Sequence, residues 1–215
     1  MKIACALVLV MVGTTVAYAD SLITLRPAGT DTVNWSQLGS PSTPIPQNFT
    51  FTTANLVSGA GHFANGSGLL SQQPYSWGGN FSPGDYVVYT NGNGPLLLTF
   101  ASGYTQIGAQ IQANFDGAFT AQICDINGCF TETGNANGAN DGSAIYIGIS
   151  SASPINLVTF GLTSSNGPQG QFAINDVTMN ASPVPSPVPE PSSLALLSTG
   201  LVGAWGAMRR RVYRA

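Results

Sequence analysis

The chain of 215 residues is poor in charge: only 7% of its residues are charged and its formal net charge is −3. Between Asp20 and Val188 the sequence holds a single basic residue, Arg26, and no lysine. One cation cannot neutralise the phosphates of a nucleic acid, so this composition excludes nucleic-acid binding. Asn, Gln, Ser and Thr are abundant instead. A surface rich in these neutral groups is common in secreted β-proteins and also suits contact with hydrated polysaccharide.

The N-terminal 19 residues predict a secretory signal peptide. Lys2 lies in a short basic start, and an apolar stretch follows it. Ala17 and Ala19 then form an A-x-A cleavage site directly before Asp20. A basic start, an apolar centre and small residues at the cleavage site together are typical of such a signal. We therefore expect residues 1–19 to be removed and the exported chain to begin at Asp20.

Residues 20–181 predict one all-β domain. Apolar and polar residues alternate in three segments, a pattern typical of half-buried strands: 107–113, 119–123 and 145–149. Further strands are expected at 21–25, 48–52, 85–89, 96–100, 155–162 and 171–179. Clusters of Gly, Pro, Asn and Ser, which favour turns, lie between them. About nine to eleven short strands predict a β-sandwich with a jelly-roll-like arrangement.

Tyr75, Trp77 and Phe81 are candidate sugar-stacking residues. They lie among glycines in segment 74–81, where a loop could display their rings. The face of a pyranose can stack on such a ring. The alternative is that these rings fill the core of the sandwich.

Cys124 and Cys129 remain after removal of the signal peptide, in an oxidising compartment. The four residues between them read as a hairpin turn that places the cysteines opposite each other. We expect a disulfide, which for so small a loop contributes about 2 kcal/mol in the chain-entropy model. A metal site would need more ligands than two cysteines, and no histidine is near in sequence. A tighter turn at 127–128 would shift the register and prevent the pairing.

The residues that carry enzyme chemistry are few. His62 is the single histidine, and no G-x-S-x-G nucleophile elbow accompanies it. Most acidic residues adjoin Gly or Asn in apparent turns, where they cap the turn. We therefore expect no catalytic residues. A pair of carboxylates facing one cleft would instead indicate a hydrolase.

No cofactor is expected. Calcium is the one metal for which the sequence offers a possible binding loop. Residues 135–142 offer amide and carboxylate oxygens on a loop. Segment 125–128 begins like a calcium loop, but Cys129 replaces the next oxygen ligand and Glu132 comes too early for an EF-hand. A plain Asn-Gly surface loop is the preferred interpretation of 135–142.

The C-terminal 34 residues have a different organisation. A proline-rich spacer, 182–191, ends in Val188, Pro189, Glu190 and Pro191. Its prolines keep it extended and remove helical hydrogen bonds. The apolar run 192–208 is at the lower limit for a transmembrane helix. The basic tail 209–215 contains Arg209, Arg210 and Arg211, which are expected to stay on the cytoplasmic side.

This order closely resembles the PEP-CTERM sorting signal of exported proteins in exopolysaccharide-producing Gram-negative bacteria. The resemblance implies an exosortase-type membrane protease acting at the motif, a precursor in the inner membrane, and a product at the cell surface or in the extracellular matrix. Residues 105–179 are similar to a recurrent ectodomain type among PEP-CTERM proteins. The closing strand, around Asp176, is similar to the last strand of jelly-roll carbohydrate-binding modules.

We therefore expect a non-enzymatic component of the cell envelope or matrix. A carbohydrate-binding module for exopolysaccharide is the first alternative, and a secreted hydrolase is the second.

Overall fold

The structure, a computed structural model, describes residues 19–181, and this part is all-β, as predicted. It contains thirteen strands and one short 3₁₀ helix, Trp35–Leu38. The strands are β1 (Ser21–Ile23), β2 (Asp31–Val33), β3 (Pro44–Ile45), β4 (Asn48–Thr52), β5 (Ser58–Phe63), β6 (Gly68–Gln72), β7 (Tyr86–Tyr89), β8 (Leu96–Ala113), β9 (Gly117–Cys124), β10 (Cys129–Ala136), β11 (Ile145–Ser164), β12 (Phe172–Ile174) and β13 (Val177–Ala181).

Two predictions fall wholly or mostly outside the described residues: the signal peptide, and the spacer, apolar run and basic tail of 182–215. Within residues 19–181, no helix has the length and apolar character needed to span a membrane.

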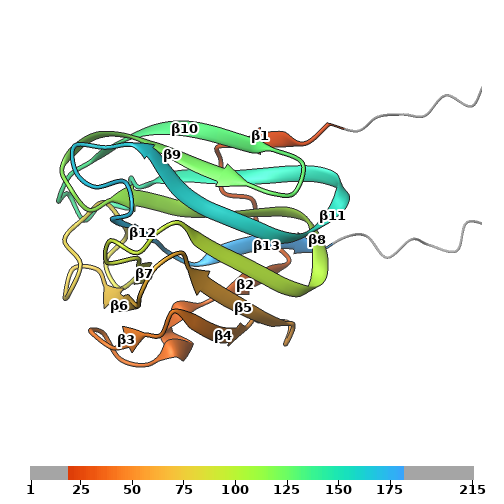
Figure 1. Cartoon of the computed structure of the whole chain (residues 1–215), viewed down its shortest axis with the longest axis horizontal. Coiled ribbons are helices and arrows are strands. Elements are labelled where there is room, and N and C mark those ends of the chain that lie inside the picture. Colours follow the sequence, from red (N-terminus) through yellow and green to blue (C-terminus); the bar gives the residue numbers. More distant parts are fainter. Residues whose placement is uncertain (1–18, 182–215) are drawn as a thin grey trace, which may run out of the picture. The chain divides into compact units, whose positions relative to one another are not determined.

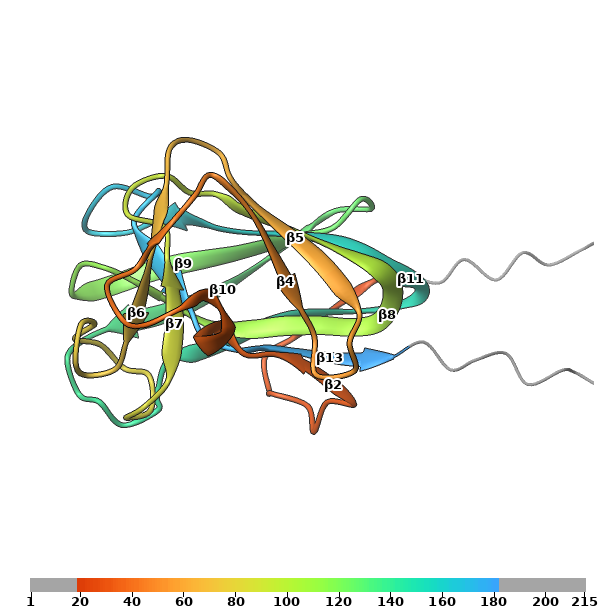
Figure 2. The same ribbon diagram turned by 90° about the horizontal axis from the view of Figure 1, so that it is seen from below.

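Two long antiparallel strands organise the domain. Strand β8 has 18 residues and β11 has 20, and they pair along most of their length. The first part of β8 also pairs with β5, whereas its later part pairs with β12 and β13. The β8–β11 pairing shifts register between Ser150 and Leu157, at the point where both strands bend. The sheet therefore folds over, and its two layers face each other across the core (Figures 1 and 2).

The sequence analysis predicted each of these two long strands as two separate short strands, which is wrong. Segments 96–100 and 107–113 belong to the single strand β8, and 145–149 and 155–162 belong to β11. The alternation of buried and exposed residues is interrupted at each bend, because bulged residues there leave the regular ladder. Conversely, the expected strand 171–179 is split into β12 and β13.

That split has a local cause at Asn175. Its side-chain oxygen accepts from the backbone nitrogen of Gln110 at 3.1 Å, and its own backbone nitrogen donates to the carbonyl of Gln110 at 3.2 Å. The amide side chain thus takes a place in the ladder that a backbone carbonyl would normally occupy. The buried indole nitrogen of Trp35 donates to the Asn175 carbonyl at 2.8 Å and holds the same junction from inside the core.

Five strands were not expected from the sequence, namely β2, β3, β5, β6 and β10. Three of them, β2, β3 and β6, have five residues or fewer. The inward positions of β5 include Gly59 and Gly61, whose missing side chains make room for the rings of Phe51 and Phe49. Strand β10 is an edge strand whose inward positions include Glu132 and Gly134, so it has no regular apolar alternation.

The core is built mainly from aromatic and branched aliphatic residues of both layers. At one end Trp35 packs edge-on against Phe51, with ring centroids 5.5 Å apart, and Phe51 packs in the same way against Phe100. Fully buried aliphatic residues such as Ile107, Ile123 and Ile147 continue the core along the sheet. This packing fills the space between the two layers.

Candidate functional site

Six strands form one continuous layer at the front of the molecule in Figure 1. Their order across the layer is β4, β5, β8, β11, β9 and β10. On each strand alternate side chains point into the core, and the others point outward, as expected for a sheet with one buried face. We call the outward side the six-strand face.

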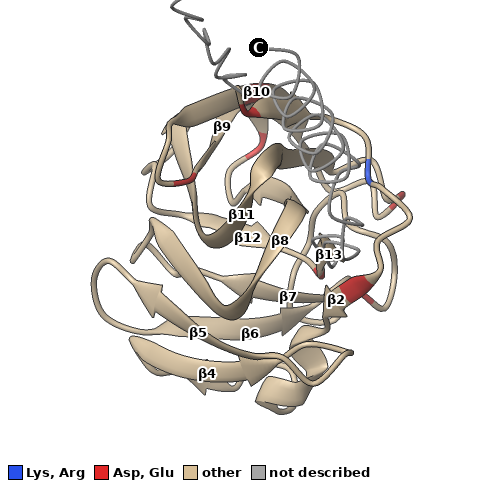
Figure 3. Cartoon of the chain, turned by 90° about the vertical axis from the view of Figure 1, so that its right-hand side faces the viewer, with Lys and Arg blue, Asp and Glu red and all other residues tan. Residues whose placement is uncertain are grey.

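The six-strand face carries hydroxyl, amide and aliphatic side chains. Its outward residues are Asn48, Thr50, Thr52, Ser58, Ala60, His62, Leu97, Thr99, Ala118, Thr120, Gln122, Cys124, Cys129, Thr131, Thr133, Asn135, Leu157, Thr159 and Gly161. These positions include no Asp, Glu, Lys or Arg. The charged residues of the described part lie elsewhere, and they are sparse (Figure 3).

A central row of side chains crosses all six strands in register. Asn48 lies opposite His62, which lies opposite Leu97, and Leu97 lies opposite Thr159. Thr159 in turn lies opposite Cys124, which pairs with Cys129. Neighbouring strands are about 4.8 Å apart, so the row is roughly 24 Å long.

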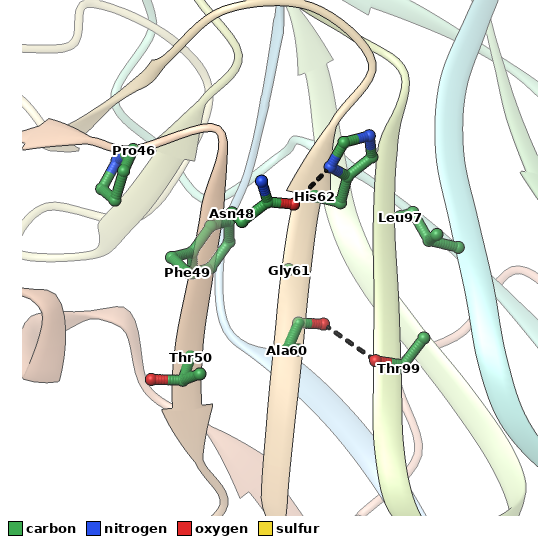
Figure 4. Close-up of a pocket in the computed structure, with 9 residues that line it drawn as sticks. All are labelled: Pro46, Asn48, Phe49, Thr50, Ala60, Gly61, His62, Leu97 and Thr99. Atoms are coloured by element: carbon green, nitrogen blue, oxygen red, sulfur yellow. Dashed lines mark hydrogen bonds between the residues drawn. The ribbon is translucent and has the colours of Figure 1, made fainter.

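A surface hollow of about 470 Å³ lies over β4, β5 and the start of β8 (Figure 4). Its lining includes Asn48, Thr50, Ala60, His62 and Leu97. The Nδ1 atom of His62 is hydrogen-bonded to Oδ1 of Asn48 at 2.7 Å, which fixes both side chains on the surface. The structure thus places the one histidine of the chain in a surface hollow whose lining is mainly apolar.

The disulfide prediction is confirmed, and the bond lies at the end of the central row. Cys124 and Cys129 are directly opposite each other and are bonded. The backbone nitrogen of Asp125 donates to the Gly128 carbonyl at 3.0 Å and closes the expected four-residue turn. The Asp125 carboxylate accepts from the backbone nitrogens of Asn127 and Gly128 at 2.8 and 3.0 Å. The turn is therefore stabilised by its own acid.

The predicted aromatic platform is not formed on the surface. Trp77 is 6% exposed and Phe81 is 0% exposed, whereas Tyr75 is 79% exposed. The rings of Trp77 and Phe81 pack with Val87 and Ala173 in a second, smaller apolar cluster. Two of the three candidate rings therefore fill an interior, which corrects their assignment as sugar-stacking residues.

Buried amides explain why the segment with these rings folds inward. The side chain of Gln73, 1% exposed, donates to the Gly79 carbonyl at 2.8 Å. The backbone nitrogen of Asn80 donates to Oε1 of Gln112 at 2.6 Å, and the Asn80 side chain donates to Ser143. Sequence reasoning took such residues as surface groups, because nothing local marks an amide as buried.

Acidic residues also accept hydrogen bonds that stabilise the fold, and Asp31 is the clearest case. Burial alone would raise the pKa of Asp31, but hydrogen bonds from Thr53, Tyr104 and backbone nitrogens outweigh it and lower that pKa. Its Oδ2 accepts from the Tyr104 hydroxyl at 2.8 Å, and burial together with this bond raises the Tyr104 pKa to about 12. Asp31 therefore links β2 to β8 and has a structural role.

Asp85 and Asp176 are neighbouring acids that the hydrolase alternative could use. Burial raises the pKa of Asp176 to about 6; the cation of Arg26 opposes this shift, and the charge of Asp85 adds to it. Oδ2 of Asp85 accepts from the Asn175 side chain and from the Ser82 backbone nitrogen, both at 3.2 Å.

The loop suggested for calcium uses its oxygens internally. Oδ1 of Asn137 accepts from the Ala139 nitrogen at 2.9 Å, and Oδ1 of Asp141 accepts from the Ser143 nitrogen at 3.0 Å. Oδ1 of Asn140 accepts from the Gln73 side chain. In residues 19–181 there is no group of three or more His, Cys, Asp and Glu side chains that could hold a metal ion.

The two ends of the described part are close in space. Ser21 pairs with Ser150, and Ala181 pairs with Tyr104, so both lie where β8 and β11 bend (Figure 2). Of the predicted cleavage residues, Ala19 and Asp20 directly precede β1, and Ala17 lies outside the described residues.

Comparison with known proteins decides the role of the C-terminal segment. Residues 187–211 match the family of the PEP-CTERM protein-sorting motif. The chain carries a PEP-CTERM sorting motif. This match contains the expected residues Val188 to Pro191 and the arginines 209–211. The PEP-CTERM motif indicates an exported protein with a membrane-anchored precursor that is sorted to the cell surface, and it implies processing by an exosortase.

Other comparisons add little to the PEP-CTERM match. No curated protein is similar to the chain. Among solved structures, CsCBM6-3 from Clostridium stercorarium, determined in complex with cellobiose, aligns with 70% of this chain and 93% of its own length. The sequence identity is 11% and the TM-score is 0.25. A similarity of this size carries no argument about the ligand of the PEP-CTERM chain.

Proposed function

We propose that residues 20–181 form a non-enzymatic component of the cell surface or extracellular matrix, with a jelly-roll-like β-sandwich architecture. An exosortase would act at the motif 188–191 while the run 192–208 spans the inner membrane. The basic tail, 209–215, would remain in the cytoplasm. The signal peptide and the C-terminal sorting signal would then both be attached at the same end of the domain, since Ser21 and Ala181 both lie near the bend of β8 and β11.

One observation carries the non-enzymatic proposal: most of the acids in residues 20–181 accept hydrogen bonds within local structure, and the histidine bonds to a neighbouring side chain through Nδ1. His62 is bonded to Asn48 on an open surface, and Asp31 is bonded to Tyr104 in the interior. Asp125 and Asp141 accept backbone hydrogen bonds within their own turns. General acid–base catalysis needs a group that is free to exchange a proton with a bound substrate.

The hydrolase alternative would rest on Asp85 and Asp176. Burial is the main cause of the raised Asp176 pKa, and a raised pKa also occurs at structural positions. The Asp85 carboxylate is held by Asn175 and Ser82. These hydrogen bonds support a structural role for Asp85.

Activity measurements test the proposal directly. The full-length protein, purified in detergent, should release no product from polysaccharide, ester or peptide substrates. Any trace activity should be unchanged in the variants Asp176→Asn and Asp85→Asn. The proposal would be abandoned if a hydrolytic activity co-purified with the folded protein and either substitution abolished it without unfolding the domain.

Carbohydrate binding is the second candidate. The observation that favours it is the six-strand face, whose side chains are uncharged and hydrogen-bonding. Binding requires no catalytic group, so it is compatible with the first proposal.

A further inference from the structure

We infer that the six-strand face binds an extended, neutral polysaccharide, which lies across the strands along the central row and not on a platform of aromatic rings. This inference rests on the proposal that the domain is a non-enzymatic surface component, and it identifies the binding surface and the class of ligand.

Charge selects the class of partner. The outward positions of all six strands lack Asp, Glu, Lys and Arg, although residues 20–181 hold eight acidic side chains. An anionic polymer would meet no cation on this face and would be repelled by the acidic domain around it. A cationic partner would find no carboxylate on the face to pair with. Electrostatic complementarity therefore favours a neutral partner.

The side chains of the face match the two kinds of surface on a sugar. Hydroxyl edges need donors and acceptors, and C–H faces need apolar contact. In the central row Leu97 stands between His62 and Thr159, and in the next row Ala60 stands between Thr50 and Thr99. In each of these two rows an aliphatic side chain thus stands between polar ones.

Several hydrogen-bonding atoms of the face have capacity for a ligand. Among residues 19–181, the hydroxyls of Thr50 and Thr159 and the Nδ2 atom of Asn48 have no hydrogen-bond partner within the protein. The His62 bond uses Nδ1, which leaves Nε2 for another partner. These atoms are exposed or half-exposed, so a polysaccharide would replace water at them.

The hollow provides a place for a sugar unit, and the layer beneath it is packed into the core. Its volume of about 470 Å³ is within the usual range of ligand sites, roughly 300–1,000 Å³. Beneath it the inward residues Phe49, Gly61 and Leu98 are buried in the core. A preorganised face loses little conformational entropy when a ligand binds.

Binding of the full-length protein to immobilised polysaccharides tests the inference. Dextran, mannan and hydroxyethylcellulose serve as neutral probes, and alginate and hyaluronate serve as acidic ones. Ala60→Arg places a long cation at an exposed position in the hollow, and Thr159→Arg does so in the central row. Ala152→Arg is the matched control, because Ala152 is likewise an exposed alanine, placed on β11 at the bend and away from the row.

We expect the wild type and Ala152→Arg to be retained on at least one neutral probe, and Ala60→Arg and Thr159→Arg to bind it about tenfold or more weakly. Near-ultraviolet circular dichroism must show that every variant is folded. Since Ala60 is exposed and packs nothing in the core, its variant remains informative even if Thr159→Arg is unstable.

Three results would overturn the inference: no neutral probe binds, only acidic probes bind, or the Ala60 and Ala152 variants bind alike. Sedimentation showing a wild-type dimer that Ala60→Arg dissociates would assign the face to a second copy of the chain. Release of reducing sugar from a polysaccharide would refute the non-enzymatic proposal. Polysaccharide binding with an affinity that Ala60→Arg leaves unchanged would refute this inference alone.

Discussion

Asp176 should make the domain less stable at neutral pH than in mild acid. The carboxyl lies between β12 and β13, near Arg26 and Asp85, and its pKa is raised from 3.8 to about 6, mainly by burial. Between these two values the folded state binds the proton more tightly than the unfolded state does. The contribution of Asp176 to the free energy of unfolding therefore falls as the pH rises from about 4 to about 6.

The size of this effect follows from the shift. A change of about two pKa units corresponds to about 3 kcal/mol. Asp176 is only partly buried, and solvent screens its charge, so we reduce the expected effect to about 1–2 kcal/mol. Asp176→Asn keeps the shape and removes the charge. The variant should exceed the wild type by this amount at pH 8 and match it more closely at pH 4.

Urea unfolding, followed by tryptophan fluorescence from pH 4 to pH 8, measures both curves. Asp31 adds a slope of opposite sign because its pKa is lowered in the folded state, but it contributes equally to both proteins and cancels in their difference. Arg26→Gln is a useful second variant, since loss of the cation should raise the Asp176 pKa further and increase the penalty at pH 8. A stability difference that is constant with pH, or a wild type more stable than Asp176→Asn at pH 8, would contradict the reasoning.

Three further predictions concern other parts of the chain. Cys129→Ser should lower the free energy of unfolding by about 2 kcal/mol, measured by urea titration, and non-reducing peptide mapping of the wild type should recover Cys124 linked to Cys129. Gly61→Ala should destabilise by about 1–3 kcal/mol, because the new Cβ would overlap the Phe49 ring, whereas Ala60→Ser on the outward side should be nearly neutral in the same titration. Replacing residues 189–191 with alanines should leave the precursor uncleaved in the inner membrane, seen as a larger band on an immunoblot; normal processing of that variant would contradict the role of the motif.

The features that the sequence predicts correctly depend on local chemistry. The alternation in segments 119–123 and 145–149 is sufficient to identify strands, because burial of one face of a sheet imposes a period of two. The disulfide follows from two cysteines that flank a four-residue turn, since the turn alone sets their pairing. The sorting motif is also linear, and it matches its family over 25 consecutive positions, 187–211.

The features that the sequence missed depend on contacts between distant segments. Whether Trp77 and Phe81 face a ligand or fill an interior is decided by Gln112 and Ser143, which bind the segment from far along the chain. The continuity of β8 and β11 likewise depends on their mutual pairing across the bend.

The six-strand face likewise combines features that the sequence shows with features that depend on contacts between distant segments. Some of its threonines, such as Thr120, fall at polar positions of strands that the sequence predicts, but their neighbours across the sheet cannot be identified from the sequence. Only the strand order β4, β5, β8, β11, β9 and β10 brings Asn48, His62, Leu97 and Thr159 into one row. The sequence by itself determined that residues 20–181 are all-β and poor in cations, and that the chain carries a sorting motif of exported proteins. The tertiary structure decided which uncharged side chains share a surface, because register between strands is set by packing of the whole core and not by any one segment.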